Sequence, residues 1–454
     1  MRPTPERMPG HEQYRGNEQH GDHGFHQVPP GPRIPQHRST CDATHESGHE
    51  DALKLPSQGQ HFAGSVGCML EPEHPGRRIA KYRKLRGMTQ TKLAMAAGVS
   101  KNRLAKVETG AAAASSVWIG AVANALGVEA DLIYGIDNER PRLDGTIPAV
   151  RRVLASTDLL PSLEPDSLEQ LRPLVEQVVR WRHAAAYAKL TKVLPDLAEQ
   201  LLVAGERDGA PAYVLLTSVY RAANTLSHKL GHNDLSMLAT DRMVWAAERS
   251  ADPLLLATTQ YVKSAALARI GATAQAIRLT DRTIADIEPY AADDTAAAVL
   301  CALHMRRAGL ACLAGDSDTT DTHFGAAGGL AERVGDRQVL GTIVGPTNLR
   351  LWELNAAVDL GRVAEAQKIA KIVRLPAEFP RERSAHYWLD TARAHLAAGK
   401  PDDAVDALQE ARSIAPEYFR NARAVKTTLE ATAEQQRRAS NGLRALSNYA
   451  GLKD

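Results

Sequence analysis

Apolar side chains between residues 77 and 135 recur at the three- and four-residue spacing of helices, in short runs that end near glycines. Lys and Arg stand between them, so each run predicts a helix with one buried and one charged face. The positions expected to form the core are Leu93, Ala94, Ala97, Val99, Leu104 and Val107. The pattern predicts five short helices, which we assign to a domain at residues 76–136.

Two of these helices are expected to form a helix-turn-helix. Thr89 is placed to cap a helix over residues 90–97, and Gly98 follows it, where a left-handed cap favours glycine. Ser100 is placed to cap the next helix, over residues 101–108. Two helices joined by such a short turn form the geometry that lays the second helix into the major groove of DNA.

A different pattern follows residues 137–148, a Pro- and Gly-bearing segment that predicts a linker. From residue 149 to residue 440, apolar residues keep helical spacing between Pro and Gly breaks, and strand patterns are absent. The sequence therefore predicts an all-α protein, with a five-helix head followed by a longer helical domain.

The helical domain contains a repeat. Its clearest copy, residues 388–416, resembles the tetratricopeptide pattern of paired helices, in which small residues allow close helix contact and Gly makes the turn. The residues that carry the resemblance are Trp388, Ala392, Gly399, Ala404, Leu408, Ala411 and Pro416. Fainter copies align on Gly231, Gly271, Gly315 and Gly361, at glycine spacings of 40, 44, 46 and 38 residues. Stacked pairs of this kind would form an α-solenoid with a concave groove.

Residues 1–75 are rich in Gly, Pro, Gln and His and have almost no apolar periodicity, which predicts a disordered tail. Nine of the sixteen histidines lie there, but their irregular spacing gives little support for a metal-binding tail. A start of translation at Met69, just before the first predicted helix, is an alternative explanation of this tail.

Charge is distributed unevenly along the chain. From residue 77 to residue 107 there are ten Lys and Arg and no Asp or Glu, whereas the whole chain carries +2. Three acidic residues follow before residue 136, so the head sums to +7 and the rest of the chain to about −5. A solvated tail could also carry positive charges alone, but the spacing of the apolar core positions excludes a tail. The combination indicates a folded domain that binds a polyanion such as double-stranded DNA.

Other classes of protein find little support in the sequence. No segment approaches 18 uninterrupted apolar residues, so we expect no membrane span, and the polar N-terminus lacks the apolar core of a signal peptide. The four cysteines have no zinc spacing, and no P-loop, GxSxG or HExxH motif is present. We therefore expect a cytoplasmic protein with no enzyme activity, no catalytic residues, no metal site and no cofactor.

The head resembles the XRE family of phage-repressor-like helix-turn-helix proteins over roughly 60 residues. The matching positions are Gln90, Leu93, Ala94, Ala97, Gly98, Val99, Ser100, Leu104, Val107, Glu108, Gly110, Leu126, Gly127 and Val128. The resemblance implies a structural ion pair between Arg83 of the first helix and Glu108, which ends the recognition helix. It also implies that Lys101, Asn102 and Lys106 touch base edges, with Gln90 reaching in from the preceding helix. Asn suits adenine and Lys suits guanine in the major groove.

The same resemblance places Arg78, Lys92, Arg103 and the backbone near Thr109 close to phosphates, which position a protein without reading sequence. The complete set predicted to contact DNA is Arg78, Gln90, Lys92, Ser100, Lys101, Asn102, Arg103, Lys106 and Thr109. The chain departs from the family pattern at residues 111–114, four alanines where relatives carry polar residues, which puts backbone contacts from this loop in doubt.

The repeat register places a set of polar residues on the groove side of the first helix of each pair. Asn can hold a peptide backbone there, and Arg can hold a carboxylate. The predicted effector groove comprises Arg221, His228, Lys229, Tyr261, Arg269, Asn348, Asn355 and Arg393. The alternative is that each of these is an ordinary polar residue on a solvated helix face.

The order of head and repeats resembles the Rgg/PlcR-type peptide-sensing transcriptional regulators. This resemblance implies a homodimer, a peptide or protein effector and an effector-linked change in head spacing. The effector could also be something other than a short peptide, or be missing altogether. A different function remains open: a tetratricopeptide-type adaptor whose head docks protein instead of DNA.

Overall fold

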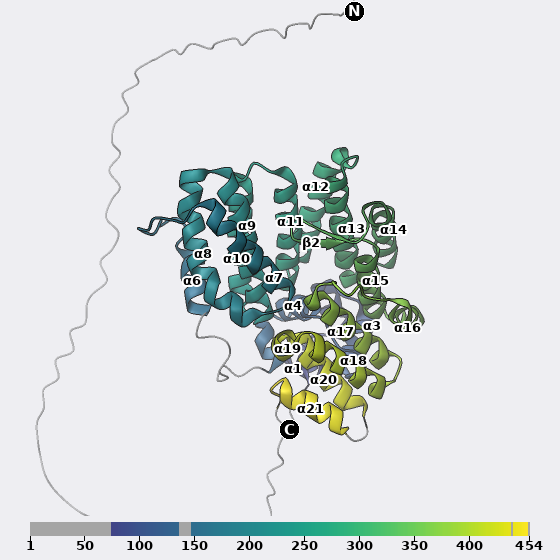
Figure 1. Ribbon diagram of the computed structural model, residues 1–454. Helices are drawn as coiled ribbons and strands as arrows, with labels where there is room; N and C mark the ends of the chain where they lie inside the picture. The colour runs from purple at the N-terminus through teal and green to yellow at the C-terminus, as the bar shows by residue number, and fades with distance from the viewer. Residues whose placement is uncertain (1–73, 136–146, 437–438, 453–454) are drawn as a thin grey trace, which may run out of the picture. The chain divides into compact units, whose positions relative to one another are not determined.

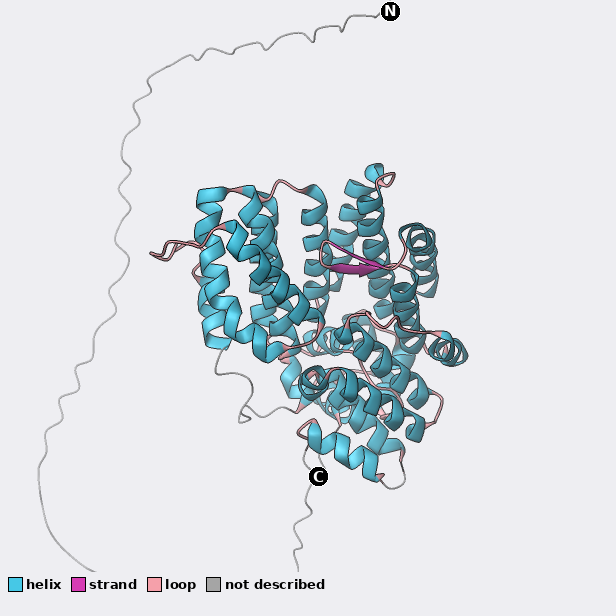
Figure 2. Ribbon diagram, in the orientation of Figure 1, coloured by secondary structure: helices cyan, strands magenta, loops and turns pink. Residues whose placement is uncertain are grey.

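The computed structural model describes residues 74–135, 147–436 and 439–452 (Figure 1). Within these ranges the chain forms twenty-one α-helices and a single two-stranded hairpin (Figure 2). The predicted all-α fold is confirmed. Residues 1–73 of the predicted tail, with its histidines up to His61 and the Met69 start, and residues 137–146 of the predicted linker lie outside the described residues. Pro75 and residues 147–148, predicted as tail and linker, instead begin the helices Pro75–Leu85 and Ile147–Ala155.

The head contains the five predicted helices. They are α1 (Pro75–Leu85), α2 (Gln90–Ala97), α3 (Lys101–Glu108), α4 (Ser116–Ala125) and α5 (Ala130–Tyr134). The Thr89 hydroxyl accepts a hydrogen bond from the Lys92 amide at 3.1 Å, and Gly98 ends α2 with a φ of +60°. Ser100 occupies the N-cap of α3, but its hydroxyl makes no capping hydrogen bond, contrary to expectation.

The head core is small and closed. Every apolar position predicted between residues 93 and 107 is buried. Trp118, Ile119 and Leu126 of the α4 region complete this core without any exposed surface. Leu313 joins the same cluster although it lies far along the chain, so the head and the repeat domain share buried apolar surface.

The second part of the chain is a series of helices, most of them packed on the next one, which we call the array (Figure 1). It contains α6 (Ile147–Ala155), α7 (Leu168–His183), α8 (Tyr187–Asp208), α9 (Ala210–Lys229), α10 (Asn233–Arg249), α11 (Pro253–Arg269), α12 (Thr273–Ile287), α13 (Asp294–Ala314), α14 (Ser317–Val334), α15 (Pro346–Leu360), α16 (Val363–Ile372), α17 (Arg381–Ala397), α18 (Pro401–Ile414), α19 (Pro416–Asn421), α20 (Arg423–Gln435) and α21 (Asn441–Tyr449). A short 3₁₀ turn, Glu288–Tyr290, follows α12.

The five glycines used to align the repeats lie at the turns of successive helix pairs. Gly231, Gly271, Gly315, Gly361 and Gly399 have φ values of +92°, +82°, +80°, +75° and +71°. They separate α9 from α10, α11 from α12, α13 from α14, α15 from α16 and α17 from α18. Because side chains with a Cβ rarely adopt this backbone conformation, glycine is the residue that permits these tight turns.

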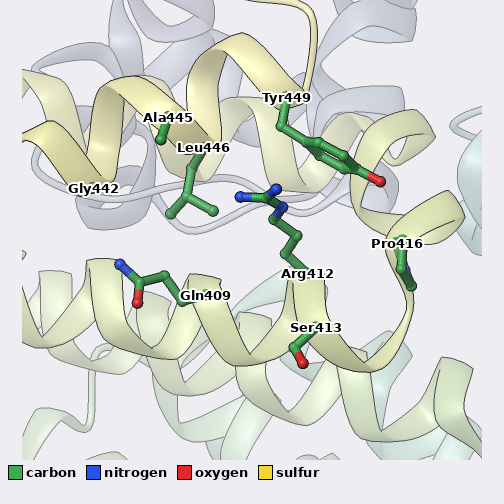
Figure 3. Close-up of a pocket in the computed structure, with 8 residues that line it drawn as sticks. All are labelled: Gln409, Arg412, Ser413, Pro416, Gly442, Ala445, Leu446 and Tyr449. Carbon is green, nitrogen blue, oxygen red and sulfur yellow. The ribbon is translucent and has the colours of Figure 1, made fainter.

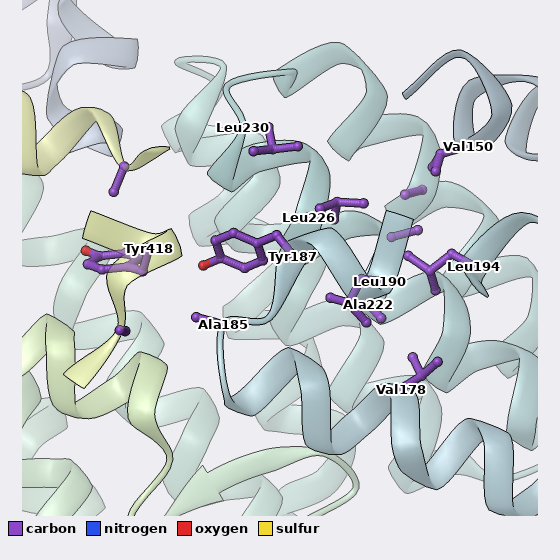
Figure 4. Packing of buried hydrophobic residues seen from close by; sticks show 14 of the residues in the cluster. Val150, Val178, Ala185, Tyr187, Leu190, Leu194, Ala222, Leu226, Leu230 and Tyr418 are labelled. Atoms are coloured by element: carbon purple, nitrogen blue, oxygen red, sulfur yellow. The ribbon is translucent and has the colours of Figure 1, made fainter. Parts of the chain in front are cut away.

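Burial explains the small residues of the clearest repeat. Ala392 of α17 and Ala404 of α18 are both fully buried, which allows these two helices to approach closely. The largest apolar cluster extends from α6 to the C-terminal helices and includes Tyr187 and Tyr418, which face each other across two distant parts of the chain (Figure 4). The array is therefore held together by contacts beyond neighbouring pairs.

The hairpin between α14 and α15 corrects the expectation that strands are absent. Its strands are β1 (Arg337–Val339) and β2 (Thr342–Val344), paired antiparallel with Val339 opposite Thr342. Leu340 and Gly341 form the two-residue turn with φ values of +45° and +73°. The sequence signal was missed because a leucine occupies a turn position that usually carries Asn, Asp or Gly.

Helix α13 is long and apolar enough to cross a membrane by length and composition, with a mean hydropathy of 1.4 over its best 18 residues. In this fold 78% of that window is buried inside the protein. It contributes Cys301, Met305 and Ala308 to a core shared with α14 and α15. Its apolar character is therefore explained by its position in the array.

Candidate nucleic-acid interface

The helix that follows the turn presents three polar side chains to solvent. Lys101, Asn102 and Lys106 are exposed on α3, and Lys92 is exposed on α2. Thr109 is exposed at the end of α3, where its hydroxyl donates to the carbonyls of Ala105 and Lys106 at 3.1 Å. These side chains are accessible to solvent.

The recognition helix is fixed to the first helix by a bidentate ion pair. Arg83 donates from Nε to Glu108 Oε1 at 2.7 Å and from Nη2 to Oε2 at 2.8 Å. The hydrogen bond to Glu108 raises the pKa of Arg83. Gln90 Nε2 donates to the same Oε2 at 2.8 Å, and Arg83 Nη1 donates to the Met88 carbonyl. The amide of Gln90 is thus oriented by the ion pair, at the start of α2.

Arg78 has a place inside the head that differs from the predicted phosphate contact. Its Nε donates to the Ile133 carbonyl at 2.7 Å and its Nη2 to the Tyr134 carbonyl at 3.0 Å. These carbonyls end α5 and lack partners within that helix. Arg78 therefore ties α1 to α5, and the guanidinium lies close enough to Gly135 that an added Cβ would stand 2.6 Å from it.

Arg103 departs further from its expected position. Only 7% of its side chain is exposed, and it forms an ion pair with Asp359 of the array. Its Nη1 donates to the Val358 carbonyl and its Nη2 to the Ala113 carbonyl, each at 3.1 Å. Burial lowers the pKa of Arg103, and the charge of Asp359 partly offsets this shift. The guanidinium faces an aspartate here, so the predicted phosphate contact is not available in this arrangement.

Two residues of the predicted effector groove lie at the same contact. Arg393 pairs with Asp359 and donates from Nη1 to Asp390 Oδ1 at 2.6 Å, and it also reaches the Ala113 carbonyl at 3.4 Å. Asn355 donates to Asp390 at 3.1 Å. We call Arg103, Asn355, Asp359, Asp390 and Arg393 the head–array cluster. Its two guanidiniums and two carboxylates balance in charge.

Further contacts join head and array around this cluster. The Thr427 hydroxyl donates to the Ala114 carbonyl at 3.4 Å, and Asn124 reaches the Gly271 carbonyl at 3.5 Å. Helix α4 lies so near α11 that a Cβ on Gly120 would stand 2.0 Å from the Arg269 carbonyl. Ala113 and Ala114 are buried, and their carbonyls accept hydrogen bonds from Arg393 and Thr427, so this end of the alanine loop contacts the array.

The turns of the array also border both ends of the recognition helix. An added Cβ on Gly315 would meet the Ser100 Cβ at 3.0 Å, and one on Gly361 would meet Lys106 Nζ at 3.5 Å. Sequence reasoning did not find this contact, because it joins residues that stand more than two hundred positions apart. The one available signal was the pair of repeat glycines, which allow close approach of another backbone.

Five of the eight predicted groove residues come together elsewhere in the array. Arg221, His228, Lys229, Tyr261 and Asn348 line one cavity of about 280 Å³, which we call the array cleft. Sequence reasoning missed the other charged and aromatic residues that line it, Arg182, His183, Arg306, Trp352, Glu382, Arg383 and His386. The remaining predicted residue, Arg269, lies in neither the array cleft nor the head–array cluster. It donates to the Ser236 hydroxyl at 2.9 Å.

A different cavity, of about 470 Å³, lies near the end of the array between α18 and α21 (Figure 3). Arg412 and Tyr449 face each other there, with the guanidinium 4.3 Å from the ring centre. A further cavity, of about 680 Å³, is lined largely by apolar groups such as Val373, Leu375 and Phe379. Neither cavity includes a residue predicted to bind an effector.

Comparison with known proteins supports the interpretation of the head. A helix-turn-helix sequence family matches residues 79–133. The head is an XRE-type helix-turn-helix domain. The match covers this domain alone, and no curated protein matches the chain.

Two solved structures are similar to the chain at low identity. The first is BtubC (BKLC) from P. vanneervenii, which is 13% identical, covers 52% of this chain and 90% of its own length, and has a TM-score of 0.35. The second is PlcR from Bacillus thuringiensis in complex with the peptide PapR7 and DNA, which is 13% identical, covers 76% and 94%, and has a TM-score of 0.28. At these TM-scores neither likeness assigns a role to a residue of this chain.

The described residues contain no group of three or more His, Cys, Asp or Glu side chains that could hold a metal ion. Burial raises the pKa of the Cys301 thiol to about 11 and raises that of Cys312 as well. Neither thiol is therefore available as a thiolate nucleophile near neutral pH.

Proposed function

We propose that this protein is a sequence-specific, DNA-binding transcriptional regulator that acts in the cytoplasm. The observation that carries the proposal is the exposure of Lys101, Asn102 and Lys106 on the helix that follows the turn of an XRE-type domain. The surrounding net charge of +7 supplies sequence-independent attraction to DNA. The exposed amide and ammonium groups supply the hydrogen bonds that read base edges.

Within this proposal the array binds an effector and provides the surface for a homodimer. Support for an effector comes from the five predicted groove residues that line one cavity. A dimer would place two recognition helices on half-sites about one helical turn apart. An effector could change that spacing only through different affinity for two arrangements of the array.

The head–array cluster offers a route from effector to DNA. Arg103 cannot lie on a phosphate while it pairs with Asp359, and the turns at Gly315 and Gly361 border the recognition helix. We infer that the docked head is the form with weak DNA affinity and that release of this contact frees the helix. In the docked form Asp359 occupies the position that a DNA phosphate would take against Arg103.

The second candidate function is a protein-interaction adaptor whose head docks protein instead of DNA. One observation favours it: the head already binds protein through Arg103 and the alanine loop after Gly110. The two functions differ in their dependence on salt, because contacts with DNA phosphates release counterions.

Fluorescence anisotropy of the purified full-length protein with labelled duplex DNA, over a salt series, separates the two functions. A regulator gives a steep fall of affinity with salt, and Lys92→Ala lowers the slope by about one unit. An adaptor gives no measurable DNA binding at low salt. Glu169→Gln, a change at an exposed position of the array, is the control that leaves the slope unchanged.

A further inference from the structure

The array cleft contains far more positive than negative charge. Arg182 of α7, Arg221 and Lys229 of α9, Arg306 of α13 and Arg383 of α17 all line it. Glu382 is the one carboxylate among the seventeen described residues that form its wall, and it pairs with Lys229 at 2.8 Å. Four guanidiniums from four helices are thus left without a carboxylate partner among the described residues.

Those guanidiniums are held by neutral groups. Arg182 Nη2 donates to the Gly341 carbonyl at 2.9 Å, and Arg221 donates to the Leu340 carbonyl at 2.8 Å and to the Thr342 hydroxyl at 2.7 Å. Arg383 Nε donates to Asn348 Oδ1 at 2.7 Å. These acceptors are neutral, so they satisfy N–H groups of the guanidiniums without offsetting their positive charge.

Burial makes this excess of charge costly. Arg182 is 8% exposed, and its Nε has no acceptor among the described residues; the same is true of Arg306 Nε. Burial, followed by the charge of Arg182, lowers the pKa of Arg221 to about 9. A buried charge without a partner destabilises a fold, so this arrangement is better suited to binding than to stability.

Several other buried arginines of this protein differ from those of the cleft because they face a carboxylate, whereas Arg269 is held by Ser236 and Asn224. Arg83 faces Glu108, and the two guanidiniums of the head–array cluster face two aspartates. At the Arg83–Glu108 pair and in the head–array cluster, a carboxylate balances the charge of each arginine. In the cleft, Glu382 is the one carboxylate of the described wall, so a bound anion would balance the remaining charge.

The walls of the cleft orient the charges. The Arg306 guanidinium lies 4.5 Å from the ring centre of Tyr261 and 4.9 Å from that of Trp352, and Arg383 lies 5.5 Å from the Trp352 ring. Stacking on aromatic rings fixes the plane of a guanidinium and leaves its edge free to donate. The planar N–H groups of arginine match the oxygens of a phosphate.

The size of the cleft limits what it can bind. Its volume of about 280 Å³ lies at the lower end of small-molecule pockets, which span about 300–1,000 Å³. A single phosphorylated metabolite fits such a volume, whereas a peptide of several residues does not. A phosphate monoester carries close to two negative charges near neutral pH and presents three acceptor oxygens.

The tip of the hairpin lies directly on the guanidiniums of Arg182 and Arg221. An added Cβ on Gly341 would stand 3.4 Å from Arg221 Nη1 and 3.5 Å from Arg182 Nη2. Leu340 beside it has a φ of +45°, a strained conformation for a residue of this size. The backbone carbonyls of this tip occupy positions where the oxygens of an anion could bind the same donors.

We propose that the array cleft binds a small phosphate-bearing anion through the guanidiniums of Arg182, Arg221, Arg306 and Arg383. The anion replaces the carbonyl oxygens of the hairpin tip, so the hairpin shifts when it binds. The hairpin leads into α15, whose Asp359 holds the recognition helix through Arg103. Any effect of the anion on DNA affinity rests on the proposed function, whereas binding of the anion does not.

Calorimetry and thermal unfolding of the full-length protein with inorganic pyrophosphate and inorganic phosphate test the proposal directly. Saturating pyrophosphate is expected to bind with measurable heat and to raise the unfolding temperature, since a ligand that binds only the folded state stabilises it. Arg306→Gln keeps a polar group against Tyr261 and Trp352, and it is expected to weaken binding about tenfold to a hundredfold. Arg221→Gln is the second variant, because it removes a different donor.

The control is Arg172→Gln, an exposed arginine on α7, which is expected to bind pyrophosphate like the unchanged protein. Without ligand, Arg306→Gln is expected to unfold at the same temperature as the unchanged protein or at a higher one. That result, together with lost binding, distinguishes a ligand site from a structural role. Absence of heat and of stabilisation with both anions overturns the proposal, as does equal binding by all variants.

A third probe distinguishes the source of the negative charge. Short peptides with a free and with an amidated C-terminus are titrated in the same way. If the peptide with a free carboxylate binds and pyrophosphate does not, the phosphate assignment is overturned. The cleft is then a binding site for a peptide C-terminus. Pyrophosphate binding with no change in DNA affinity supports the site and counts only against its link to the head.

Discussion

At the scale of single residues, Arg83 and Glu108 show how one ion pair sets the orientation of the recognition helix. Glu108 accepts hydrogen bonds from both Arg83 and Gln90 while only 5% of its side chain is exposed. We predict that Glu108→Leu destabilises the protein by about 3–5 kcal/mol, because it leaves the arginine unpaired in a partly buried place.

The double variant Arg83→Met with Glu108→Leu is expected to lose less stability than the single change, since both charges are then absent. Urea denaturation of the full-length protein measures each free energy of unfolding. A double variant as unstable as the sum of the two single variants would contradict this account of the pair.

Glu430 gives a prediction that depends on pH. Burial raises the pKa of this carboxyl to about 7 from its ordinary 4.5, against the opposing charges of Arg78 and Lys426. A raised carboxyl pKa means that the folded state holds the proton more tightly than the unfolded state. The resulting contribution to stability is present below about pH 4.5 and is lost as the pH rises through about 7.

Glu430→Gln is therefore expected to raise the free energy of unfolding at pH 8 by an amount on the order of 1–3 kcal/mol, with a smaller effect at pH 5. Thermal or urea unfolding at the two pH values measures the difference. Glu434→Gln on the same helix is the control. Equal effects of Glu430→Gln at both pH values would show that its ionisation does not govern stability.

Among single residues, the sequence predicted local contacts far better than distant ones. Thr89, Gly98, Arg83 and Glu108 follow a spacing that the family pattern contains. The partner of Arg103 could not be found in this way, because Asp359 lies on a helix whose packing against the head has no local sequence pattern. The family resemblance and the positive charge of the head lead to the prediction that Arg103 contacts a DNA phosphate.

At the scale of elements, glycines mark the turns of the array. Gly399 has a φ of +71° and open space around its missing side chain. Gly399→Ala is thus expected to cost about 1 kcal/mol from backbone conformation alone. Gly325 lies within α14, also with open space and with ordinary helical backbone, so Gly325→Ala is expected to stabilise by about 0.5–1 kcal/mol.

The two substitutions add the same methyl group and differ in backbone conformation, so their opposite signs are the test. Urea denaturation of both variants and of the unchanged protein provides the measurement. Two changes of the same sign would mean that the left-handed turn at Gly399 does not hold in solution.

Helices were predictable as elements because their apolar spacing and caps are local. The hairpin was not, because each strand has three residues and its turn carries Leu340 in a left-handed conformation. Its carbonyls are held by Arg182 and Arg221, which lie more than a hundred residues earlier in the chain. Such a segment takes its conformation from the array around it.

At the scale of the whole molecule, the docking of the head on the array is the main feature that the sequence did not reveal. The repeat register predicted Asn355 and Arg393 for an effector groove, and both instead belong to the contact with the head. Five of the other six groove residues line the array cleft together, and Arg269 lies outside it.

This docking leads to a prediction for DNA affinity. Asp359→Asn removes a carboxylate that faces both Arg103 and Arg393 and leaves two guanidiniums in contact without compensation. We expect about tenfold tighter binding to duplex DNA or more, because breaking a buried ion pair favours the released head. Anisotropy with labelled duplex gives the dissociation constants.

Asp321→Asn is the matched control, because Asp321 pairs with Arg362 at an exposed site of the array. It is expected to leave DNA affinity unchanged. DNA affinity that is equal or lower in Asp359→Asn would contradict the inference that the docked head is the weakly binding form.

The most direct test of the central claim is capture of genomic DNA fragments by the purified full-length protein, alongside a variant with Lys101→Ala and Asn102→Ala together. Each of these side chains is expected to contribute about 1–3 kcal/mol to a specific site. A regulator enriches a short, two-fold symmetric motif that the double variant loses. The same fragments recovered by both proteins, or no enriched motif even when Asp359→Asn is added, would contradict sequence-specific DNA binding.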